Sequence, residues 1–483
     1  MTERPGWFAR LFRTARFRTW REVDLAKYAV MQQATEALER AITLAADANK
    51  HLKQTASATA KATAELETAS EQLSEAARMV GAAREKFGAH FVDQAFFERE
   101  HADRHQLSPW LDASAHRVRD DVFVAAIALH KAFIDAAARP LRHNLSALMD
   151  TFGSRVLSGA EKEALLPDLW ASLLLVVPVV SITFASVDRM LGRLPPETLG
   201  WLLIDEAGQA LPQAAVGALM RSKRAVVVGD PLQIEPVVEL SDTLTKTICR
   251  RFGVDPDRFN APEASVQALA DEATPYVAEF AGRQGSRTVG VPLLVHRRCA
   301  EPMFGISNAI AYERLMVNAK EPALSAVREL IGASRWFNIQ GAAEEKWCPQ
   351  EGQLVVQLLQ QMAQRGMNPD LYIITPFRIV QDNLRKVIRD SGVLNGWTDD
   401  PWKWTTDRVG TVHVAQGREA EAVIFVLGAS APQQTGARDW AGKRPNLLNV
   451  AVTRAKEAFY IVGNRPLWCT AGVFRELDAR ISD

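Results

Sequence analysis

Apolar side chains recur every seven residues in the first third of the chain, which contains neither glycine nor proline from Trp7 to Val80. The first heptad position, written a, holds Met31, Leu38, Ala45, Leu52, Thr59, Leu66, Leu73 and Val80. The fourth position, written d, holds Ala34, Ala41, Ala48, Thr55, Ala62, Ala69 and Ala76. This repeat predicts a coiled coil, which at 1.5 Å per residue would extend ~75 Å from Met31 to Val80. Its partner helix lies either in the same chain or in a second copy, and the small d residues would allow that helix to approach closely.

From about Trp170 onward, short apolar runs alternate with helical segments, which is the pattern of an α/β fold. The runs Trp201–Ile204 and Val226–Val228 end abruptly in Asp205-Glu206 and Gly229-Asp230. Uninterrupted apolar runs of this kind predict strands of a parallel sheet, buried on both faces. Four more strands are predicted at Leu371–Thr375, Thr411–Val414, Ala422–Leu427 and Ala458–Val462.

Two other stretches are predicted to be mainly helical. The first runs from about Asp112 to Met149 and has one apolar face. The second, Leu169 to Val187, carries no charged residue, but Pro178 and several hydroxyl residues interrupt it. We interpret this second stretch as the end of a helix followed by a core strand, and not as a membrane span.

These patterns divide the chain into four predicted parts. Residues 1–21 form a basic amphipathic leader rich in arginine and aromatic residues, and 22–150 form a helical coiled-coil insertion or stalk. Residues 151–290 form part of a first α/β domain, and 291–483 form a second. The leader has the composition of a helix for a membrane surface or a nucleic acid, but we favour one basic helix of a larger protein.

Composition limits the classes of function. The 483 residues are 47% hydrophobic and 24% charged, with 57 basic and 57 acidic side chains, so any nucleic-acid binding must come from local patches. The four cysteines are far apart and lack metal-ligand spacing, which predicts reduced thiols in a cytoplasmic protein. We expect no membrane partner.

Polar residues at the ends of the predicted strands form the candidate site, because chemistry in parallel sheets collects at the carboxyl edge. Asp205 and Glu206 would divide the work there: one carboxylate would hold Mg²⁺, which bridges phosphates, and the other would orient a water molecule. Gln233, just past the next strand, is placed to sense a γ-phosphate. Adjacent acids alone are common at strand ends, so the prediction depends on both strand ends together.

Four later segments extend this pattern: the stretches around Arg298, Pro376 and His413, and the helix-to-strand run NLLNVAVTRAKEAFYIVG. Together with DEAGQA and GDPLQ they resemble the superfamily 1 helicases, in the branch that includes the nonsense-mediated-decay helicase. The resemblance covers roughly residues 170 to 465, and the motifs occur in family order. It implies an α/β fold of two RecA-like parallel-sheet domains, preceded by the long helical region.

The resemblance also implies roles for individual residues. Asp205 would bind Mg²⁺, Glu206 would activate water, Gln233 would contact the γ-phosphate of ATP, and Arg298 and Arg454 would act as arginine fingers. Gln416, Gly417 and Glu419 belong to the next motif, and Gly417 and Glu419 would line the nucleotide side of the cleft. The residues implied to face a nucleic-acid backbone are Thr183, Ser186, Pro376, Thr411 and His413. Simpler interpretations stay open: Arg298 pairs with a surface acid, His413 and Thr183 are structural, and the tryptophans Trp397, Trp402 and Trp404 pack domains together and do not stack on bases.

One family motif has no match. The phosphate-binding loop G-x-x-x-x-G-K-[ST] does not occur in this sequence. In the family this loop precedes the helical insertion. The resemblance therefore implies the C-terminal portion of a helicase, with an incomplete first domain. We expect that domain either to be marginally stable or to associate with a separate polypeptide that supplies the loop.

The sequence thus predicts an ATP-dependent helicase or translocase, or the C-terminal part of one, that moves on single-stranded DNA or RNA. The alternative is a non-catalytic helicase remnant that binds nucleic acid or protein. On either interpretation we expect the chain alone to turn over no ATP.

Overall fold

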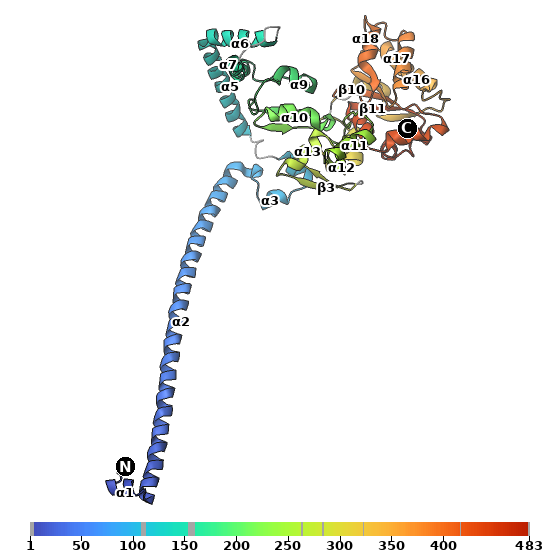
Figure 1. Ribbon diagram of the computed structural model, residues 1–483. Helices are drawn as coiled ribbons and strands as arrows, with labels where there is room; N and C mark the ends of the chain where they lie inside the picture. The colour runs from blue at the N-terminus through green and yellow to red at the C-terminus, as the bar shows by residue number, and fades with distance from the viewer. Residues whose placement is uncertain are drawn as a thin grey trace. The chain divides into compact units, whose positions relative to one another are not determined.

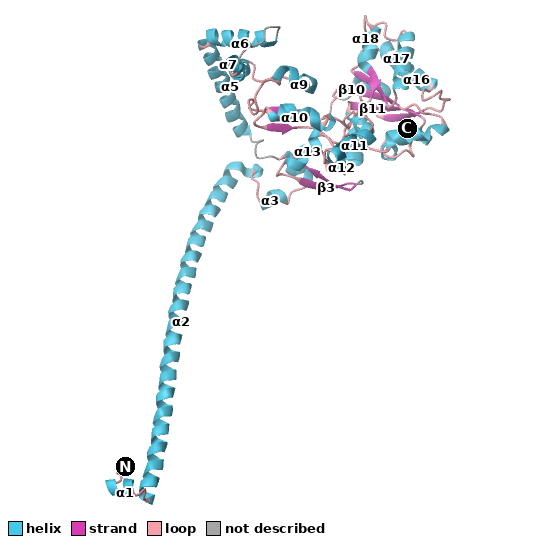
Figure 2. Ribbon diagram, viewed as in Figure 1, coloured by secondary structure: helices cyan, strands magenta, loops and turns pink. Residues whose placement is uncertain are grey.

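The computed structural model describes residues 4–107, 113–152, 160–261, 264–282, 285–321, 323–415 and 417–481. Within it the chain divides into two units, Met1–Asp93 and Gln94–Asp483, which are taken in turn. Figure 1 traces the chain and Figure 2 colours its helices and strands.

The first unit is almost entirely one helix. A short helix α1 (Trp7–Leu11) is followed by α2 (Ala15–Phe87), a gently curved helix of 73 residues, and by the turn η1 (Gly88–His90). The prediction of a long N-terminal helix is confirmed. The leader and stalk do not separate at residue 21, because α2 already begins at Ala15, just after Arg13 takes a positive φ of 48°.

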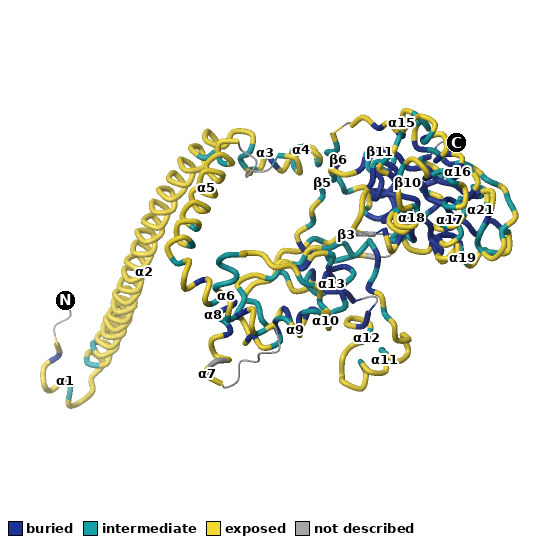
Figure 3. The backbone as a smooth tube through the Cα atoms, turned by 90° about the horizontal axis from the view of Figure 1, so that it is seen from above, coloured by how far each residue is buried: buried dark blue, intermediate teal, exposed yellow. Residues whose placement is uncertain are grey.

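None of the side chains of α2 is buried, and the helix is exposed along its whole length in Figure 3. The heptad a side chains Leu52, Leu66 and Leu73 are 69%, 70% and 72% exposed. The helix ends before Gly88, whose φ of +51° suits glycine. Arg84 and Lys86 in the last turn stabilise the helix, because their positive charges lie at the negative end of its dipole.

The second unit begins with helices that form a small core of their own. They are α3 (Gln94–Phe97), α4 (His101–Gln106), α5 (Ala113–Ala136), α6 (Ala138–Phe152), α7 (Ala160–Glu163), α8 (Leu166–Val176) and α9 (Phe184–Leu191). Helices α6 and α8 pack together, and Leu148, Leu166 and Trp170 are buried between them and α9. The helices predicted between Asp112 and Met149 are therefore present as α5 and α6.

The core strand predicted before Val187 is wrong. Helix α8 ends at Val176, because the residue before Pro178 is disfavoured in helical geometry. The segment from Val177 to Ile182 forms no strand, and Val179 is 72% exposed. Thr183 is the residue that begins α9.

Next comes the pair of parallel strands β1 (Leu202–Ile204) and β2 (Ala225–Val227), as predicted. Between the two strands lie η3 (Ala207–Gln209) and α10 (Pro212–Met220). After β2 come α11 (Asp242–Arg251), α12 (Pro256–Phe259), α13 (Val266–Ala273) and the antiparallel pair β3 (Ala278–Gly282) and β4 (Gly285–Val289). The prediction that both faces of β1 and β2 are buried is wrong. Ile204 is buried against Ala215 and Val266, but Leu203 on the opposite face is 67% exposed, since no described element covers that face.

The main sheet is parallel throughout, in the order β7-β11-β10-β8-β9. Its strands are β7 (Arg335–Asn338), β8 (Leu371–Thr375), β9 (Val409–Thr411), β10 (Ala420–Val426) and β11 (Ala455–Gly463). Strand β8 has the predicted bounds, while β9 ends at Thr411, where that strand was predicted to start. The small parallel pair β5 (Val295–His296) and β6 (Val317–Asn318) precedes the sheet.

Helices surround this sheet and complete the larger core. They are α14 (Met303–Ala311), α15 (Ala326–Ile331), α16 (Pro349–Gln364), α17 (Arg378–Asp390), α18 (Pro401–Arg408), η4 (Pro432–Gln434), α19 (Thr435–Gly442), α20 (Asn446–Thr453), α21 (Arg465–Trp468) and α22 (Phe474–Asp478). Trp336, Tyr460 and Phe425 are fully buried among them, and Figure 3 shows the buried residues concentrated at β10 and β11. The α/β fold with a parallel sheet is confirmed.

One buried carboxyl group makes the stability of this core depend on pH. Glu351, in the first turn of α16, is fully buried and accepts hydrogen bonds from the Gly428 N–H (2.8 Å) and the Ser430 hydroxyl. Burial raises its pKa from 4.5 to about 7, although both hydrogen bonds oppose the shift. Between these two values the folded state binds more protons than the unfolded state.

We therefore expect Glu351 to reduce the free energy of unfolding as pH rises from about 4.5 to about 7, by up to about 3 kcal/mol. Denaturation followed by tryptophan fluorescence, in wild type and Glu351→Gln, would measure the difference across that range. The exposed Glu329→Gln should show no such pH-dependent difference. A difference between wild type and Glu351→Gln that stays constant from pH 4 to 8 would contradict the assignment.

Candidate functional site

The turns that follow β1 and β2 touch each other. The Ala207 N–H donates to the Val228 carbonyl over 2.9 Å. A Cβ atom at Gly229 would lie 2.6 Å from the backbone nitrogen of Gly208, and one at Gly208 would lie 2.6 Å from the carbonyl oxygen of Asp230. Both positions therefore exclude any side chain, and the DEAG and GDP sequences meet at one edge, as parallel pairing of their strands predicts.

Backbone geometry fixes the two acids. Glu206 adopts a left-handed conformation with φ of 53°, which is uncommon for a residue other than glycine. Its N–H donates to Asp205 Oδ1 (2.9 Å), and its own Oε2 accepts from Gln209 Nε2 (3.0 Å). The two carboxylates thus leave the strand with different orientations and partners, which a division of roles requires.

The GDPLQ loop is held by the second α/β part of the chain. Asn449 of α20 donates from Nδ2 to the Leu232 carbonyl (2.9 Å) and to the Tyr312 hydroxyl (2.9 Å). Asn446 of the same helix donates to the Pro231 carbonyl (3.3 Å) and to the Gln233 carbonyl. Side chains of α20 therefore hydrogen bond directly to the backbone of this loop.

Tyr312 also holds the loop by a hydrogen bond. Its hydroxyl donates to Asp230 Oδ2, and burial next to that carboxylate raises the pKa of Tyr312, so the phenol stays protonated. Ser307 of α14 donates to Asn449 Oδ1 (2.7 Å), which fixes the orientation of the asparagine amide. The sequence reasoning missed Tyr312, Asn446 and Asn449. Helical spacing offered a signal for Asn449, which lies one turn before Thr453, but nothing in the sequence marked Tyr312.

Next to this loop lies a cavity of about 660 Å³. It is lined by polar and charged residues from both α/β parts, among them Asp230, Gln233, His296, Arg297, Arg298, Tyr312, Lys320, Glu419, Thr453 and Lys456. Gln233 donates from Nε2 to Asp230 Oδ2 (3.3 Å), while its Oε1 is buried without a hydrogen-bond partner among the described residues. A buried acceptor of this kind is typical of a position that bonds a ligand or water.

Ion pairs bring three predicted motifs together in the cavity. Glu419 accepts from Lys456 Nζ (2.7 Å) and from Arg298 Nε (2.9 Å). The hydrogen bond from Lys456, followed by the charges of Lys456 and Arg298, lowers the pKa of Glu419. The structure thus places Arg298 and Glu419 in contact. Gly417 lies in the exposed turn before Glu419, and Gln416 lies outside the described residues.

Arg454 lies beside this group but is only 2% exposed. Its guanidinium donates to the carbonyls of Arg418 (3.1 Å) and Val450 (3.3 Å). Burial, followed by the charge of Arg298, lowers the pKa of Arg454, and the charge of Glu206 partly opposes this shift. The acid of the first strand end and the guanidinium of the last motif are therefore close enough to interact.

Two titratable groups close to these charges, His296 in the cavity wall and the buried Cys299 bonded to it, are uncharged. Burial lowers the pKa of His296 to about 4, and its Nε2 accepts from the Cys299 N–H (2.9 Å), so the imidazole is neutral. Burial raises the pKa of the Cys299 thiol to about 12, which disfavours the nucleophilic thiolate. The charges at this site therefore come from the acids, lysines and arginines.

The residues predicted to face a nucleic-acid backbone fall into separate groups. Thr183 and Ser186 hydrogen bond to each other (3.3 Å) at the start of α9. Thr411 ends β9, and its N–H donates to Gln381 Oε1 (2.9 Å). Pro376 is buried after β8, so the expectation that it presents itself to a bound strand does not hold in this structure.

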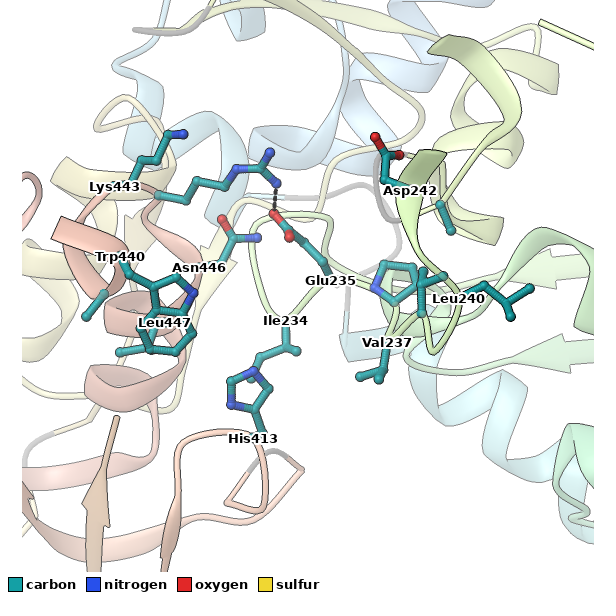
Figure 4. Close-up of a pocket in the computed structure, with 15 residues that line it drawn as sticks. Ile234, Glu235, Val237, Leu240, Asp242, His413, Trp440, Lys443, Asn446 and Leu447 are labelled. Carbon is teal, nitrogen blue, oxygen red and sulfur yellow. Dashed lines mark hydrogen bonds and ion pairs between the residues drawn. The ribbon is translucent and has the colours of Figure 1, made fainter. Parts of the chain in front are cut away.

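His413 contributes to a second pocket of about 500 Å³, shown in Figure 4. One wall is the segment after GDPLQ, including Ile234 and Val237, and the other is the end of α19 with Trp440 and the residues after it. Arg444 and Glu235 form an ion pair between these walls. Trp440 is 57% exposed and was not singled out by the sequence analysis.

The tryptophans near residue 400 have a different environment. The rings of Trp397 and Trp404 contact each other at a tilt of 47° with centroids 6.0 Å apart, and both pack against the large core. Trp402 is exposed, with the Arg389 guanidinium 3.7 Å from its ring centroid. This arrangement favours the packing interpretation for Trp397 and Trp404.

Parallel strands, paired acids at a strand end and a cavity lined by arginines and lysines thus characterise this α/β protein. Residues 14–240 and 309–466 each match a family model described as an AAA domain. The chain is 27% identical over 271 residues to the DNA replication ATP-dependent helicase/nuclease DNA2 of Gallus gallus, covering 55% of this chain and 23% of that protein. It is 23% identical over 295 residues to the DNA-binding protein SMUBP-2 of Rattus norvegicus, covering 59% of this chain and 27% of that protein.

The chain belongs to the superfamily 1 helicases. It spans about a quarter of the length of the curated relatives it matches. Among solved structures, an arterivirus nonstructural protein 10 helicase in complex with DNA matches with 14% identity and a TM-score of 0.27, covering 56% of this chain and 42% of the viral one. In the part of the chain that the structure describes, no helix is long and apolar enough to cross a membrane.

The hydrogen bonds from α20 to the GDPLQ loop can be tested directly. Asn449→Ala would leave the Leu232 carbonyl and Tyr312 hydroxyl without this donor, at a cost of about 1–3 kcal/mol in stability. We expect faster hydrogen exchange in peptides covering residues 229–240, measured by mass spectrometry.

Asn308→Ala is the matched control, because Asn308 is also buried but bonds only to the backbone of Met316. It should lower stability without a selective change at residues 229–240. Equal exchange at these residues in both variants would show that α20 does not hold the loop.

Proposed function

We propose that the chain is the motor part of an ATP-dependent helicase or translocase that couples ATP hydrolysis to movement on single-stranded DNA or RNA. The observation that carries this proposal is the cavity in which Gln233 and Asp230 from one α/β part face Arg298, Glu419 and Lys456 from the other. A site built from two parts of the chain can change when its occupant changes. That property is what a motor needs.

The residues of the cavity fit a nucleoside triphosphate in three respects. The volume of about 660 Å³ is within the usual range for small-molecule sites. Lys456 and Arg298 supply positive charge, and the buried Oε1 of Gln233 offers an unused acceptor for a water molecule. Arg454 is a buried cation that lacks an ion-paired carboxylate among the described residues, so a nearby phosphate would offset its desolvation.

Each predicted residue then has a role in the proposal. Asp205 would hold Mg²⁺, which in such sites takes few protein ligands and bridges phosphates. Glu206 would orient and deprotonate water, while Gln233 would position that water. Arg298 and Arg454 would stabilise the charge that develops on the transferred phosphoryl group, an effect that is worth roughly 10³-fold or more in rate. Gly417 would leave room for the nucleotide beside Glu419.

The proposal assigns the cavity the part of the nucleotide site that these residues can form, and it does not include a G-x-x-x-x-G-K-[ST] run, which this sequence does not contain. The alternative function, a non-catalytic module that binds nucleic acid or protein, predicts no dependence of nucleotide binding on the arginines of the cavity. The following measurement separates the two.

Arg298→Ala should weaken binding of a fluorescent ATP analogue about tenfold or more, because the loss of a charge-assisted contact is worth about 1.5–3 kcal/mol. Arg258→Ala is the matched control: Arg258 is also a half-exposed arginine paired with a glutamate, Glu272, but it lies outside the cavity lining. Equal binding by both variants would favour the non-catalytic module.

For turnover, we expect the chain alone to remain near the background rate in a phosphate-release assay. Robust ATP hydrolysis that disappears in Glu206→Gln would show that these residues turn over ATP without a G-x-x-x-x-G-K-[ST] loop, while supporting the role of Glu206.

For nucleic acid, we propose that a strand passes over the pocket of Figure 4, where Trp440 offers an exposed ring, Lys443 a cation and His413 a polar group. Thr411, at the end of β9 shortly before His413, would contact the backbone of the same strand. Thr183 and Ser186, at the start of α9, would contribute hydroxyl donors elsewhere along its path. Such groups bind any sequence, because they meet phosphates and base faces and not base edges.

Trp440→Ala should weaken binding of a fluorescent single-stranded oligonucleotide by about 1–3 kcal/mol, roughly 5- to 150-fold, with little change in salt dependence. Lys443→Ala should instead lower the slope of log affinity against log salt by about one. Anisotropy titrations with DNA and RNA over a range of salt concentrations would measure both effects.

Trp402→Ala is the control for Trp440, since Trp402 is also an exposed tryptophan, although Arg389 contacts its ring, and it lies outside the pocket. Identical losses in the two tryptophan variants would contradict the assigned path. A salt slope near zero for the wild type would argue against contacts with the backbone altogether.

A further inference from the structure

Charged side chains are confined to one side of helix α2. In the heptad defined by Met31 as position a, every Asp, Glu, Lys and Arg between residues 31 and 80 lies at b, c or f, with the single exception of Glu65 at g. Glu65 is paired within the helix to Lys61 (3.8 Å). Positions a, d, e and g therefore form a nearly uncharged face, which we call the seam.

The seam is fully exposed although it carries large apolar side chains. Leu38, Leu52, Leu66 and Leu73 at a are each more than 60% exposed, as are Ile42 at e and Leu44 at g. Charge segregation of this kind is typical of a helix whose seam is covered by another helix, since a solvated helix gains nothing from it.

Length limits the helices of this chain that could cover the seam. The apolar columns a and d continue through Ala83 and Phe87, flanked there by the cations Arg84 at e and Lys86 at g, so these columns extend ~85 Å from Met31 to Phe87. The longest other described helix, α5, has 24 residues and extends ~36 Å. A helix of the length of α2 itself is needed, and a second copy of the chain provides one.

We propose that α2 pairs in antiparallel orientation with α2 of a second copy of this chain. The two columns of the seam differ in size, and this difference selects the orientation. In a parallel pair, layers of two leucines would alternate with layers of two alanines, and the axes would have to be far apart and close together in turn. In an antiparallel pair each a residue faces a d residue, so each large a side chain meets a small d side chain, while Ala45 and Thr59 form layers of two small residues with Ala76 and Ala62.

The register that covers the longest part of the seam pairs residues whose numbers add up to 121. Leu52 then faces Ala69, Leu73 faces Ala48, Val80 faces Ala41, and Phe87 faces Ala34. In this register Lys50 of one copy lies level with Glu71 of the other, and Lys53 lies level with residue 68, next to Glu67. A parallel in-register pair would instead place each of these charges level with its own copy, where like charges repel.

Cysteine cross-linking in the full-length chain tests the orientation, because α2 contains no native cysteine. Two chains, Ala45→Cys and Ala76→Cys, are made with the partly exposed Cys249 and Cys469 changed to serine, while the buried Cys299 and Cys348 are retained. Positions 45 and 76 face each other in the antiparallel pair, while like positions lie ~45 Å apart.

We expect rapid disulfide formation only when the two chains are mixed. Disulfide formation within each chain type alone would demonstrate a parallel pair and overturn the antiparallel proposal. Failure of both the mixture and the single types to cross-link would overturn pairing in this seam.

The molar mass of the protein in solution tests whether a second copy of the chain covers the seam. The wild-type chain should be dimeric at micromolar concentration in size-exclusion chromatography with light scattering, and Leu52→Glu at position a should be monomeric. Ser57→Glu at position f adds the same charge on the solvated side and should remain dimeric, and circular dichroism should show that both variants keep their helix. A monomeric wild type, or equal masses for both variants, would overturn the proposal.

The test is independent of the proposed motor function. Loss of nucleotide or oligonucleotide binding leaves the mass unchanged, and Leu52→Glu touches no residue of either pocket.

Discussion

The hydrogen bonds of Asn449 are the constraint on which the site depends. One amide donates to a backbone carbonyl of the GDPLQ loop and to Tyr312, while its oxygen accepts from Ser307. Since the asparagine is fully buried, each bond is costly to lose. Helix α20 also ends in Thr453 and Arg454, so a single element holds the loop and presents the guanidinium. A displacement of this helix would therefore move both sides of the cavity at once.

The positive charges around that helix are not fully balanced by ion-paired carboxylates. Glu419 is shared by Arg298 and Lys456, which leaves more positive than negative charge at this point. Arg454 is bonded only to neutral oxygens and is buried beside Arg298, and this lowers its pKa. Both features are unfavourable by themselves, because like charges and buried cations cost free energy. An anion in the cavity would relieve them, so the same groups that lower the stability of the site would favour phosphate binding.

Local patterns predicted a large part of the fold, for reasons that particular elements show. Strand β8 has the predicted bounds because it is buried on every side, so its apolar run coincides with the strand. The segment Val177–Ile182 has a similar composition but forms no strand, because strand formation needs a neighbouring strand and not only β-branched residues. Likewise, Asp205, Gln233 and Arg298 were predicted from motifs in the sequence. Tyr312 was not, because a single tyrosine acquires its partner, Asp230, only through tertiary contact.

The same distinction explains why burial was predicted correctly for one sheet and not for the other. In the five-stranded sheet, β10 has neighbours on both edges and helices around it, and its apolar residues are buried. In the β1–β2 pair, Ile204 is buried and Leu203 is exposed, although both belong to one continuous apolar run. A run that is apolar at successive positions indicates that both faces of the strand are suited to burial. Leu203 and Trp201 therefore mark a face suited to contact with another apolar surface, beside the turn that carries Asp205 and Glu206. A surface bound there would lie on the strand that positions both acids, and it would restrict their motion.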